Sequence, residues 1–335
     1  MNESPASVPA TLFPNAPRAE VVDALDVART PPGTVGRYYL PLVTDGLGLP
    51  VHVPVLVARG AADGPVVGIT AAVHGNELNG IPVIQRLFGE LDVAGLRGTV
   101  VGVPGVNVPA LVRKQRRFID GVDLNHVMPG RADGTVSQVY AHRVVERLVR
   151  HFDYLFDLHT ASNGRVNSYY LRADMASDEV RRMAVLQGAQ IIVHNPPGDG
   201  TLRGAADDLG IPALTFEVGD PNTFQRGVIR ESTTGLYNFL VDRGMVDGVI
   251  EESDAATVHC ARSYWLYTDE GGLLSVLPRI TERVAAGQEV AVLRNVFGDE
   301  IKRFRAPEAG IVIGHSVNPV CQTGGRILHL GVVAP

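Results

Sequence analysis

Residues 66–80 read VVGITAAVHGNELNG, and we interpret this stretch as the centre of the fold. Residues 66–73 are an apolar run typical of a fully buried strand, and a helical pattern follows from residue 78 to about residue 91. His74 and Glu77 therefore stand where a strand gives way to a helix. In open α/β sheets, ligands bind at this edge, outside the carboxyl ends of the strands. An imidazole and a carboxylate at this spacing can converge there as two of the three protein ligands of a catalytic zinc site.

Two later stretches end in a similar way. Residues 153–160 read DYLFDLHT, an apolar strand that ends near His159. Residues 211–219 read IPALTFEVG and place Glu217 near the end of a third apolar strand. An ionised glutamate inside such a strand is costly unless it is paired or works with a metal. Three such strand ends in one domain favour a metal site that an isolated His-x-x-Glu motif would support only weakly.

Composition limits the class of protein. The chain has 335 residues, which suggests about two domains, and 45% of them are apolar, enough for a sizeable core. The net charge of −6 gives no basic surface for nucleic acid. Cys260 and Cys321 form no C-x-x-C motif, so a reduced, cytoplasmic setting is the simpler interpretation. We expect no signal peptide and no membrane span, because the chain has neither an apolar h-region near its start nor an apolar run of about 18 residues.

The chain divides into three parts. Residues 1–35 are rich in proline and alanine, and we expect an N-terminal extension that lies on the surface or is partly disordered. Residues 36–250 alternate between strand and helix patterns, which favours a largely parallel or mixed sheet with helices on both faces. Residues 251–335 show short strands, frequent glycine and proline, and no helical pattern, so we expect a small all-β domain. The individual strands are expected at residues 37–43, 51–58, 98–103, 168–172 and 190–194, and the helices at 136–150, 177–187, 202–209 and 228–244.

Residues 107–130 show no clean period, and a loop of this length inside a compact domain is usually functional or disordered. It carries Arg116 and Arg117, followed by Asn125 and His126. The arginines are either a solvated basic loop or an anion clamp beside the metal, and the sequence leaves both interpretations open. An arginine suits a developing oxyanion or a substrate carboxylate.

Four motifs in a fixed order define a resemblance. They are His74-Gly75-Asn76-Glu77, Asp123-Leu124-Asn125, Asp157-Leu158-His159-Thr160 and Glu217-Val218-Gly219. With them, about residues 35–245 resemble the succinylglutamate desuccinylase/aspartoacylase family of the zinc carboxypeptidase-like superfamily. The resemblance implies a three-layer α/β domain with a mixed sheet, one catalytic Zn²⁺ per chain, and hydrolysis of the amide bond of a small N-acyl amino acid or related amine. The C-terminal β domain, through residues 306–312, resembles a barrel-sandwich domain of the biotinyl/lipoyl-like kind. It has no lysine placed for lipoylation.

The resemblance also implies roles for single residues. It assigns three metal ligands, His74, Glu77 and His159, and a general base, Glu217. Arg117 resembles the arginine that polarises the scissile carbonyl. Its spacing to the Asp-Leu-Asn motif is one residue longer than in the family, and Arg116 is the alternative for this role. Asp157 shares a strand face with His159 and is either a partner of that ligand or a buried structural aspartate.

Four further residues are candidates for substrate binding. Asn125 matches a substrate-binding asparagine, and Arg203 resembles the arginine that the family brings to a substrate carboxylate. His126 departs from the family pattern Asp-Leu-Asn-Arg, and a histidine cannot clamp a carboxylate bidentately. This departure weakens a specific prediction of aspartate or glutamate derivatives. Arg165, like Arg172, is either a pocket cation or an ordinary surface residue.

The leading hypothesis is a zinc-dependent amidohydrolase, an N-acyl amino acid deacylase. One alternative is a metallocarboxypeptidase or peptide-trimming amidase, and the other is a non-enzymatic metal-containing binding protein with a vestigial site. We expect a small-molecule N-acyl substrate and neither a nucleic-acid nor a membrane partner. The sequence leaves homo-oligomer formation open.

Overall fold

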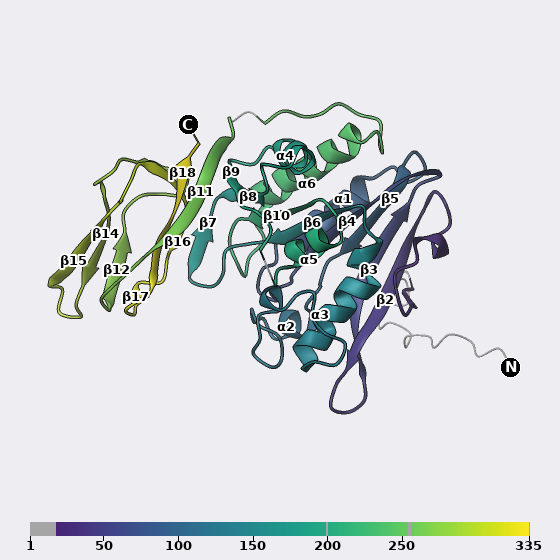
Figure 1. The fold of residues 1–335 in the computed structure, drawn as a ribbon, viewed down its shortest axis with the longest axis horizontal. Helices are drawn as coiled ribbons and strands as arrows, with labels where there is room; N and C mark the ends of the chain where they lie inside the picture. Colours follow the sequence, from purple (N-terminus) through teal and green to yellow (C-terminus); the bar gives the residue numbers. More distant parts are fainter. Residues whose placement is uncertain (1–17, 199, 254–255, 335) are drawn as a thin grey trace.

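The structure, a computed structural model, describes residues 18–198, 200–253 and 256–334. Strands and helices alternate along the chain as far as residue 242 (Figure 1). The strands of this part are β1 (Glu20–Val21), β2 (Thr34–Thr44), β3 (Pro50–Arg59), β4 (Ala62–Ala71), β5 (Arg97–Val103), β6 (Tyr154–His159), β7 (Arg165–Asn167), β8 (Tyr169–Ala173), β9 (Ile191–His194) and β10 (Ala213–Val218). The helices are α1 (Gly80–Glu90), α2 (Val108–Val112), α3 (Val136–Arg147), α4 (Asp178–Val185), α5 (Leu202–Asp208) and α6 (Arg226–Asp242), with short 3-10 turns η1 (Val27–Arg29), η2 (Leu124–His126) and η3 (Val149–His151).

A mixed sheet runs through the described part of the chain, in the order β1-β2-β3-β5-β4-β6-β10-β8-β9, followed by four C-terminal strands, β11 (Val258–Tyr267), β18 (Arg326–Val333), β16 (Gly310–Ser316) and β13 (Arg283–Val284). At its centre, β5, β4, β6 and β10 run parallel to one another. The antiparallel pairs β2–β3 and β10–β8 flank this centre. The predicted mixed α/β sheet is therefore confirmed. Because the central strands are parallel, their carboxyl ends meet at one edge, where the candidate residues lie.

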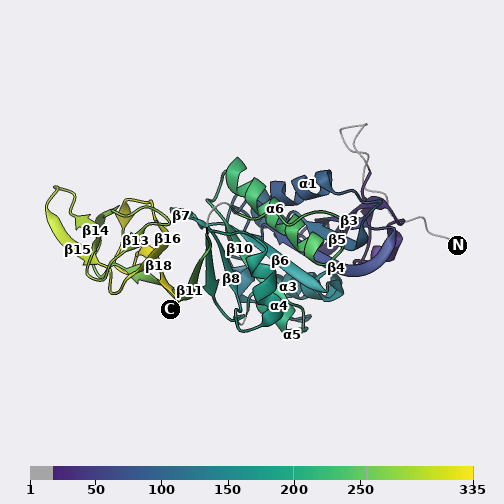
Figure 2. The ribbon, with the colours of Figure 1, turned by 90° about the horizontal axis from the view of Figure 1, so that it is seen from above.

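Two hydrophobic cores lie on the two faces of the sheet. One contains buried side chains of α1, α4 and α6, among them Leu87, Met183 and Phe239. The other contains buried side chains of α3 and α5, such as Tyr140 and Leu202. Each helix turns an apolar stripe toward the sheet, which is why helices cover both faces. Figure 2 shows α1 and α6 lying together along one side of the sheet, and the two helices contact each other.

Several element boundaries differ from the expected ones. Helix α1 begins at Gly80, after both candidate ligands, and not at residue 78. The long loop 107–130 contains the short α2 and the η2 turn, which are too short to show a period. Ser177 caps α4, and its hydroxyl accepts a hydrogen bond from the N–H of Val180.

The N-terminal extension is only partly described, because residues 1–17 lie outside the described residues. The part that follows belongs to the fold: β1 pairs with β2, and Val22 and Leu25 are buried in the core that contains α3.

The C-terminal part consists of β11 (Val258–Tyr267), β12 (Gly272–Val276), β13 (Arg283–Val284), β14 (Glu289–Arg294), β15 (Glu300–Arg305), β16 (Gly310–Ser316), β17 (Val320–Cys321) and β18 (Arg326–Val333). Between residues 256 and 334 the structure contains strands and no helix, as expected. Strands β12, β14, β15 and β17 form a second sheet, and the C-terminal strands enclose a hydrophobic core of their own. They project from the helix-covered part of the sheet (Figure 1). The domain boundary at residue 250 stays a prediction, because β9 and β11 pair in parallel and join the two parts in one sheet.

Two features bear on the expected setting of the protein. Cys260 and Cys321 are both buried and free, so they form no disulfide with each other. Among the residues that the structure describes, none of the helices combines the length and apolar character needed to cross a bilayer.

Candidate metal centre and active-site pocket

His74 and Glu77 lie in the turn between β4 and α1. The N–H of Glu77 donates to the carbonyl of His74 over 3.1 Å, which closes the turn and brings the two side chains together. Gly75, between them, packs on α2: a Cβ there would lie 2.1 Å from the carbonyl carbon of Ala110, so a larger residue does not fit. The Asn107 side chain caps α2 and also donates to the carbonyl of the residue before His74. This turn is therefore held against α2 by packing and by hydrogen bonds.

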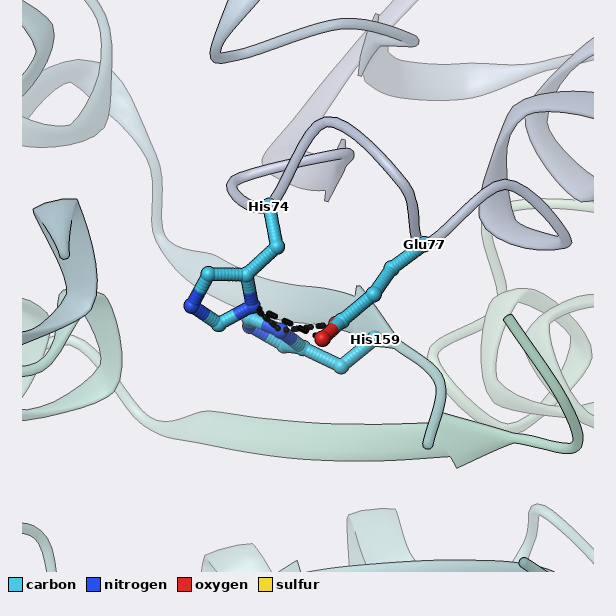
Figure 3. A group of neighbouring side chains, drawn as sticks. All are labelled: His74, Glu77 and His159. Carbon is cyan, nitrogen blue, oxygen red and sulfur yellow. Dashed lines mark hydrogen bonds and ion pairs between the residues drawn. The ribbon is translucent and has the colours of Figure 1, made fainter. Parts of the chain in front are cut away.

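His159, the last residue of β6, completes a group of three side chains (Figure 3). Its Nδ1 lies 3.2 Å from Nδ1 of His74 and 3.0 Å from Oε2 of Glu77. Nδ1 of His74 lies 3.1 Å from Oε1 of Glu77. One ligand atom from each residue lies within 4.8 Å of the others, and all three residues are buried. Two imidazole nitrogens and a carboxylate are a donor set of catalytic zinc sites, so the group fits a divalent metal.

The outer nitrogen of each histidine lies beside a carboxylate. Nε2 of His159 lies 2.7 Å from Oδ2 of Asp157, and Nε2 of His74 lies 2.9 Å from Oδ1 of Asp123. A carboxylate at the outer nitrogen fixes the orientation of the ring and favours the tautomer whose inner nitrogen can bind a metal. Of the two interpretations of Asp157, its contact matches a partner of the ligand. The Asp123 contact was not foreseen from the sequence, although Asp123 belongs to one of the motifs.

Charge is concentrated in this buried group. Burial tends to lower the pKa of His74, but Glu77 and Asp123 outweigh it and raise that pKa above its ordinary value. Burial alone would raise the pKa of Glu77, yet His74 and His159 hold it well below its usual range. Glu77 is therefore a carboxylate at neutral pH, as a metal ligand must be.

The three side chains open into a cavity of about 300 Å³. This volume is at the small end of the range for ligand pockets. The cavity is lined by both polar and aromatic groups, and five of its lining residues are arginines. Of the residues singled out in the sequence, it is lined by His74, Glu77, Arg116, Asn125, His126, His159, Arg165, Arg172, Arg203 and Glu217.

Glu217 lies in β10 directly opposite His159 of β6 in the parallel register. Its side chain is 13% exposed, and its Oε2 accepts a hydrogen bond from the Asn167 side chain over 3.2 Å. Arg172 approaches Oε1 to 3.5 Å. Burial raises the pKa of Glu217 above its ordinary value, although Arg172 acts in the opposite direction. A carboxyl group with a raised pKa in a pocket is suited to accept and return a proton.

The structure distinguishes the two arginines of the loop. Arg116 reaches into the cavity, where it donates to Oε1 of Glu77 and to the hydroxyl of Ser162, each over 2.7 Å. Arg117 is exposed, does not line this cavity, and donates to the carbonyl of Gly121. Adjacent residues of the loop point in different directions, and the cavity lies on the side of Arg116. Arg117 was expected to reach the pocket, but Arg116 lines it instead.

The other predicted substrate-binding residues differ in how deeply they are buried. Asn125 accepts a hydrogen bond from the N–H of Leu202, which ties η2 to the start of α5. Arg203 is buried and donates to the side chain and carbonyl oxygens of Asn195. Burial, followed by the nearby Arg172, lowers the pKa of Arg203 to about 10. His126 is exposed at the rim of the cavity.

Some lining residues were not foreseen. Tyr170 and Asn195 belong to the α/β part, whereas Trp265 and Arg326 come from the C-terminal strands. None of the four has a local signal in the sequence, although Trp265 is the single tryptophan of the chain.

Comparison with known proteins gives the evolutionary context. Residues 63–242 match the Succinylglutamate desuccinylase/Aspartoacylase catalytic domain. The N-alpha-acetyl-L-2,4-diaminobutyric acid deacetylase of Halomonas elongata is 26% identical over 275 residues, which cover 78% of this chain and 80% of that protein. The succinylglutamate desuccinylase of Pseudomonas paraeruginosa is 29% identical over 170 residues, which cover 47% of this chain and 51% of that protein.

Solved structures agree on the fold. A succinylglutamate desuccinylase/aspartoacylase from Rhodobacter sphaeroides has a TM-score of 0.81 at 24% identity and covers 92% of this chain and 98% of that one. The product-bound ectoine utilization protein EutE (DoeB) from Ruegeria pomeroyi has a TM-score of 0.81 at 22% identity. The match covers 89% of this chain and 95% of that one. The match over residues 63–242 spans more than half of the 335 residues, so this chain belongs to the succinylglutamate desuccinylase/aspartoacylase family.

Proposed function

We propose that the protein is a zinc-dependent amidohydrolase that removes the acyl group from a small N-acyl amino acid or related amine. The observation that carries this proposal is the convergence of His74, Glu77 and His159 in a cavity that Glu217 also lines. The family supports it, because relatives of the chain are named as a deacetylase and as desuccinylases. The small volume of the cavity, about 300 Å³, suits a small molecule better than a folded peptide segment.

The residues of the centre fit one zinc ion per chain. His74 and His159 would each present Nδ1, and Glu77 would present its carboxylate. Such an ion, when bound, supplies a Lewis acid that polarises an amide carbonyl and makes water more acidic. Asp157 and Asp123 hold the two rings in the orientation that this requires.

Glu217 is the proposed general base. As water attacks the amide carbonyl carbon, Glu217 accepts one of its protons and later returns it to the nitrogen of the leaving amine, so that the C–N bond breaks with a neutral amine as product. Because burial raises the pKa of Glu217, its protonated form holds the proton more firmly until the amine nitrogen takes it. Asn167 orients the carboxyl group through the hydrogen bond to Oε2.

Arg116 is the proposed donor to the oxyanion that forms on the carbonyl oxygen. Its guanidinium already lies at the edge of the ligand group, beside Glu77. Asp123 and Ser162 hold this side chain from two further sides, so that the donors are placed before substrate arrives. A fixed donor of this kind stabilises the transition state more than the ground state.

Arg203 is the proposed partner of a substrate carboxylate, and Asn125 and His126 also line the cavity. Asn195 holds the Arg203 guanidinium, so its direction is set before binding. A hydrolysis panel tests the whole proposal, with N-acetyl and N-succinyl amino acids on one side and peptides with free C-termini on the other. We expect turnover of the N-acyl amino acids by the zinc-loaded protein. Preferred cleavage of peptides would replace the proposal with a carboxypeptidase, and stoichiometric zinc without any hydrolysis would replace it with a binding protein.

A further inference from the structure

Strand β7 lies between two residues that contact the proposed catalytic groups. At its end, the buried Asn167 donates a hydrogen bond from Nδ2 to Oε2 of Glu217 over 3.2 Å. Before its start, the hydroxyl of Ser162 accepts a hydrogen bond from Arg116 over 2.7 Å. Residues 162–168, the β7 segment, therefore contact both the proposed base and the proposed oxyanion donor.

The C-terminal part of the chain holds the β7 segment. Among the described strands, β7 pairs only with β16, and Asn167 stands opposite Gly314 in this antiparallel register. On one side of β7, the carbonyl of Gly164 accepts a hydrogen bond from the N–H of Val317 over 2.8 Å. The segment belongs to the α/β part in sequence, but its strand partner comes from the C-terminal part.

On the other side of β7, Ser168 is bound twice to one carbonyl group. Its N–H donates to the carbonyl of Ile313 over 2.9 Å, and its hydroxyl donates to the same oxygen over 3.0 Å. The register between β16 and β18 shifts at this point, between Val312 and Gly314. Bulges are common next to active sites, where they re-aim nearby groups. The irregular point of β16 is thus the point at which it binds the β7 segment.

Gly314 lets β16 lie directly against the side chain of Asn167. A Cβ at this glycine would lie 2.2 Å from Oδ1 of Asn167 and 2.5 Å from the carbonyl oxygen of Val166. Because no side chain fits at such distances, a larger residue would displace β7 or the Asn167 amide. On its other edge, Gly314 stands opposite His329, whose ring stacks on Trp265 with ring centroids 5.0 Å apart. Strand β16 is therefore packed on the side away from β7, and the displacement would fall on β7.

We propose that β16, through Gly314 and Asn167, positions Glu217, so that the C-terminal part of the chain takes part in catalysis. This inference rests on the proposed function of Glu217 as a general base. Asn167 is the residue through which β16 acts, because its contact with Oε2 is shorter than the 3.5 Å approach of Arg172 to Oε1. A base must be aligned with the attacking water, and a misplacement of about 1 Å can cost on the order of 100-fold in rate.

Steady-state kinetics on an N-acyl amino acid test this inference in the zinc-loaded full chain. For Gly314→Ala and for Asn167→Ala we expect kcat to fall about 10- to 100-fold, with KM changed less than about 3-fold. Because both changes act on one contact, the double variant should be as active as Asn167→Ala alone, within about 2-fold. Gly271→Ala is the matched control and should behave as wild type. This exposed glycine of the C-terminal part has room for a Cβ, which would lie 3.5 Å from its nearest contact, the carbonyl oxygen of Cys321.

Ser168→Ala is a milder probe, which serves if Gly314→Ala does not fold. It removes only the hydroxyl bond to β16, so we expect kcat to fall about 3-fold, and we expect no further fall when it is added to Asn167→Ala. Effects that multiply in the double variants would show that β16 acts on the fold in general and would overturn the positioning role.

Crystal structures give a measurement without turnover. In zinc-loaded Gly314→Ala, Nδ2 of Asn167 should lie beyond hydrogen-bond distance of Oε2 of Glu217, whereas in Gly271→Ala it should stay within that distance. A broken contact in a protein that hydrolyses no N-acyl substrate would uphold the positioning of Glu217 by β16 and refute the proposed function. Hydrolysis by the wild type together with an intact contact in Gly314→Ala would overturn the positioning role alone.

Discussion

Nε2 of His159 lies 2.7 Å from Oδ2 of Asp157, two residues earlier in the same strand. The two side chains meet because alternate residues of a strand share one face. The other oxygen of Asp157 accepts a hydrogen bond from the hydroxyl of Thr70 in the neighbouring strand, over 2.7 Å. The aspartate is therefore held on both sides, and the His159 ring is turned with Nδ1 toward His74 and Glu77.

Asp157→Asn should weaken metal binding without removing a ligand. The asparagine has nearly the same shape but no charge to set the tautomer of His159, so we expect the zinc affinity to fall about 10- to 100-fold. Competition with a chelator of known affinity measures this. Asp133→Asn, at an exposed position that does not line the cavity, is the control and should leave the affinity unchanged. Equal zinc affinities for Asp157→Asn and wild type would refute the role of this contact.

The neighbouring loop arginines offer a matched pair. Arg116→Ala removes the guanidinium that lies beside Glu77, and we expect kcat to fall on the order of 100-fold. Arg117→Ala removes an exposed side chain that only donates to a backbone carbonyl, and we expect a change of less than about 3-fold. Steady-state kinetics on an N-acyl amino acid distinguish the two. If Arg117→Ala were the more damaging change, the assignment of Arg116 would be wrong.

Glu217→Gln should abolish proton transfer while the metal centre stays intact. We expect kcat to fall about 100- to 10,000-fold, because an amide cannot accept the proton. Glu217 does not belong to the cluster of His74, Glu77 and His159, so the zinc content should equal that of wild type. Elemental analysis of the same samples gives that comparison. Zinc loss in parallel with activity would show that Glu217 supports the metal and not the proton transfer.

His329 should make stability depend on pH. Burial, then Arg172 and Arg326, lower its pKa to about 3, from 6.5 in an exposed histidine. The neutral ring therefore stabilises the fold above pH 6.5, and this contribution is lost as the pH falls toward 3, since the unfolded chain takes up the proton first.

His329→Phe keeps a ring against Trp265 and removes the titrating group. It also removes Nδ1, which has no hydrogen-bond partner among the described residues. Urea unfolding from about pH 7 to about pH 4 should show a smaller fall in the free energy of unfolding for the variant than for wild type. Parallel pH profiles for the two proteins would contradict a neutral, buried His329.

The sequence predicted the sheet and the convergence of His74, Glu77 and His159, because both depend on local patterns. The apolar runs that became β4, β6 and β10 each ended next to a candidate residue, and parallel strands bring such ends together. His159 and Glu217 are opposite each other in that register, as the shared edge required. The grouping of these side chains at one edge of the sheet therefore follows from the sequence pattern.

Two features of the pocket could not be predicted, each for a physical reason. The loop that carries Arg116 has no periodicity, so nothing in the sequence indicates which of two adjacent arginines faces inward. Trp265 and Arg326 reach the cavity only because β7 pairs with β16 and places the C-terminal strands beside it. Such pairing over long sequence separations leaves no local signal.

The central claim is that His74, Glu77 and His159 bind a single metal ion, and zinc stoichiometry tests it most directly. After exposure of the full chain to zinc and removal of the excess, elemental analysis should find about one zinc ion per wild-type chain. His159→Ala and Glu77→Gln should retain about a tenth of that or less under the same conditions, with folding confirmed by circular dichroism. A folded wild-type chain without zinc, or variants that hold as much zinc as wild type, would contradict the claim.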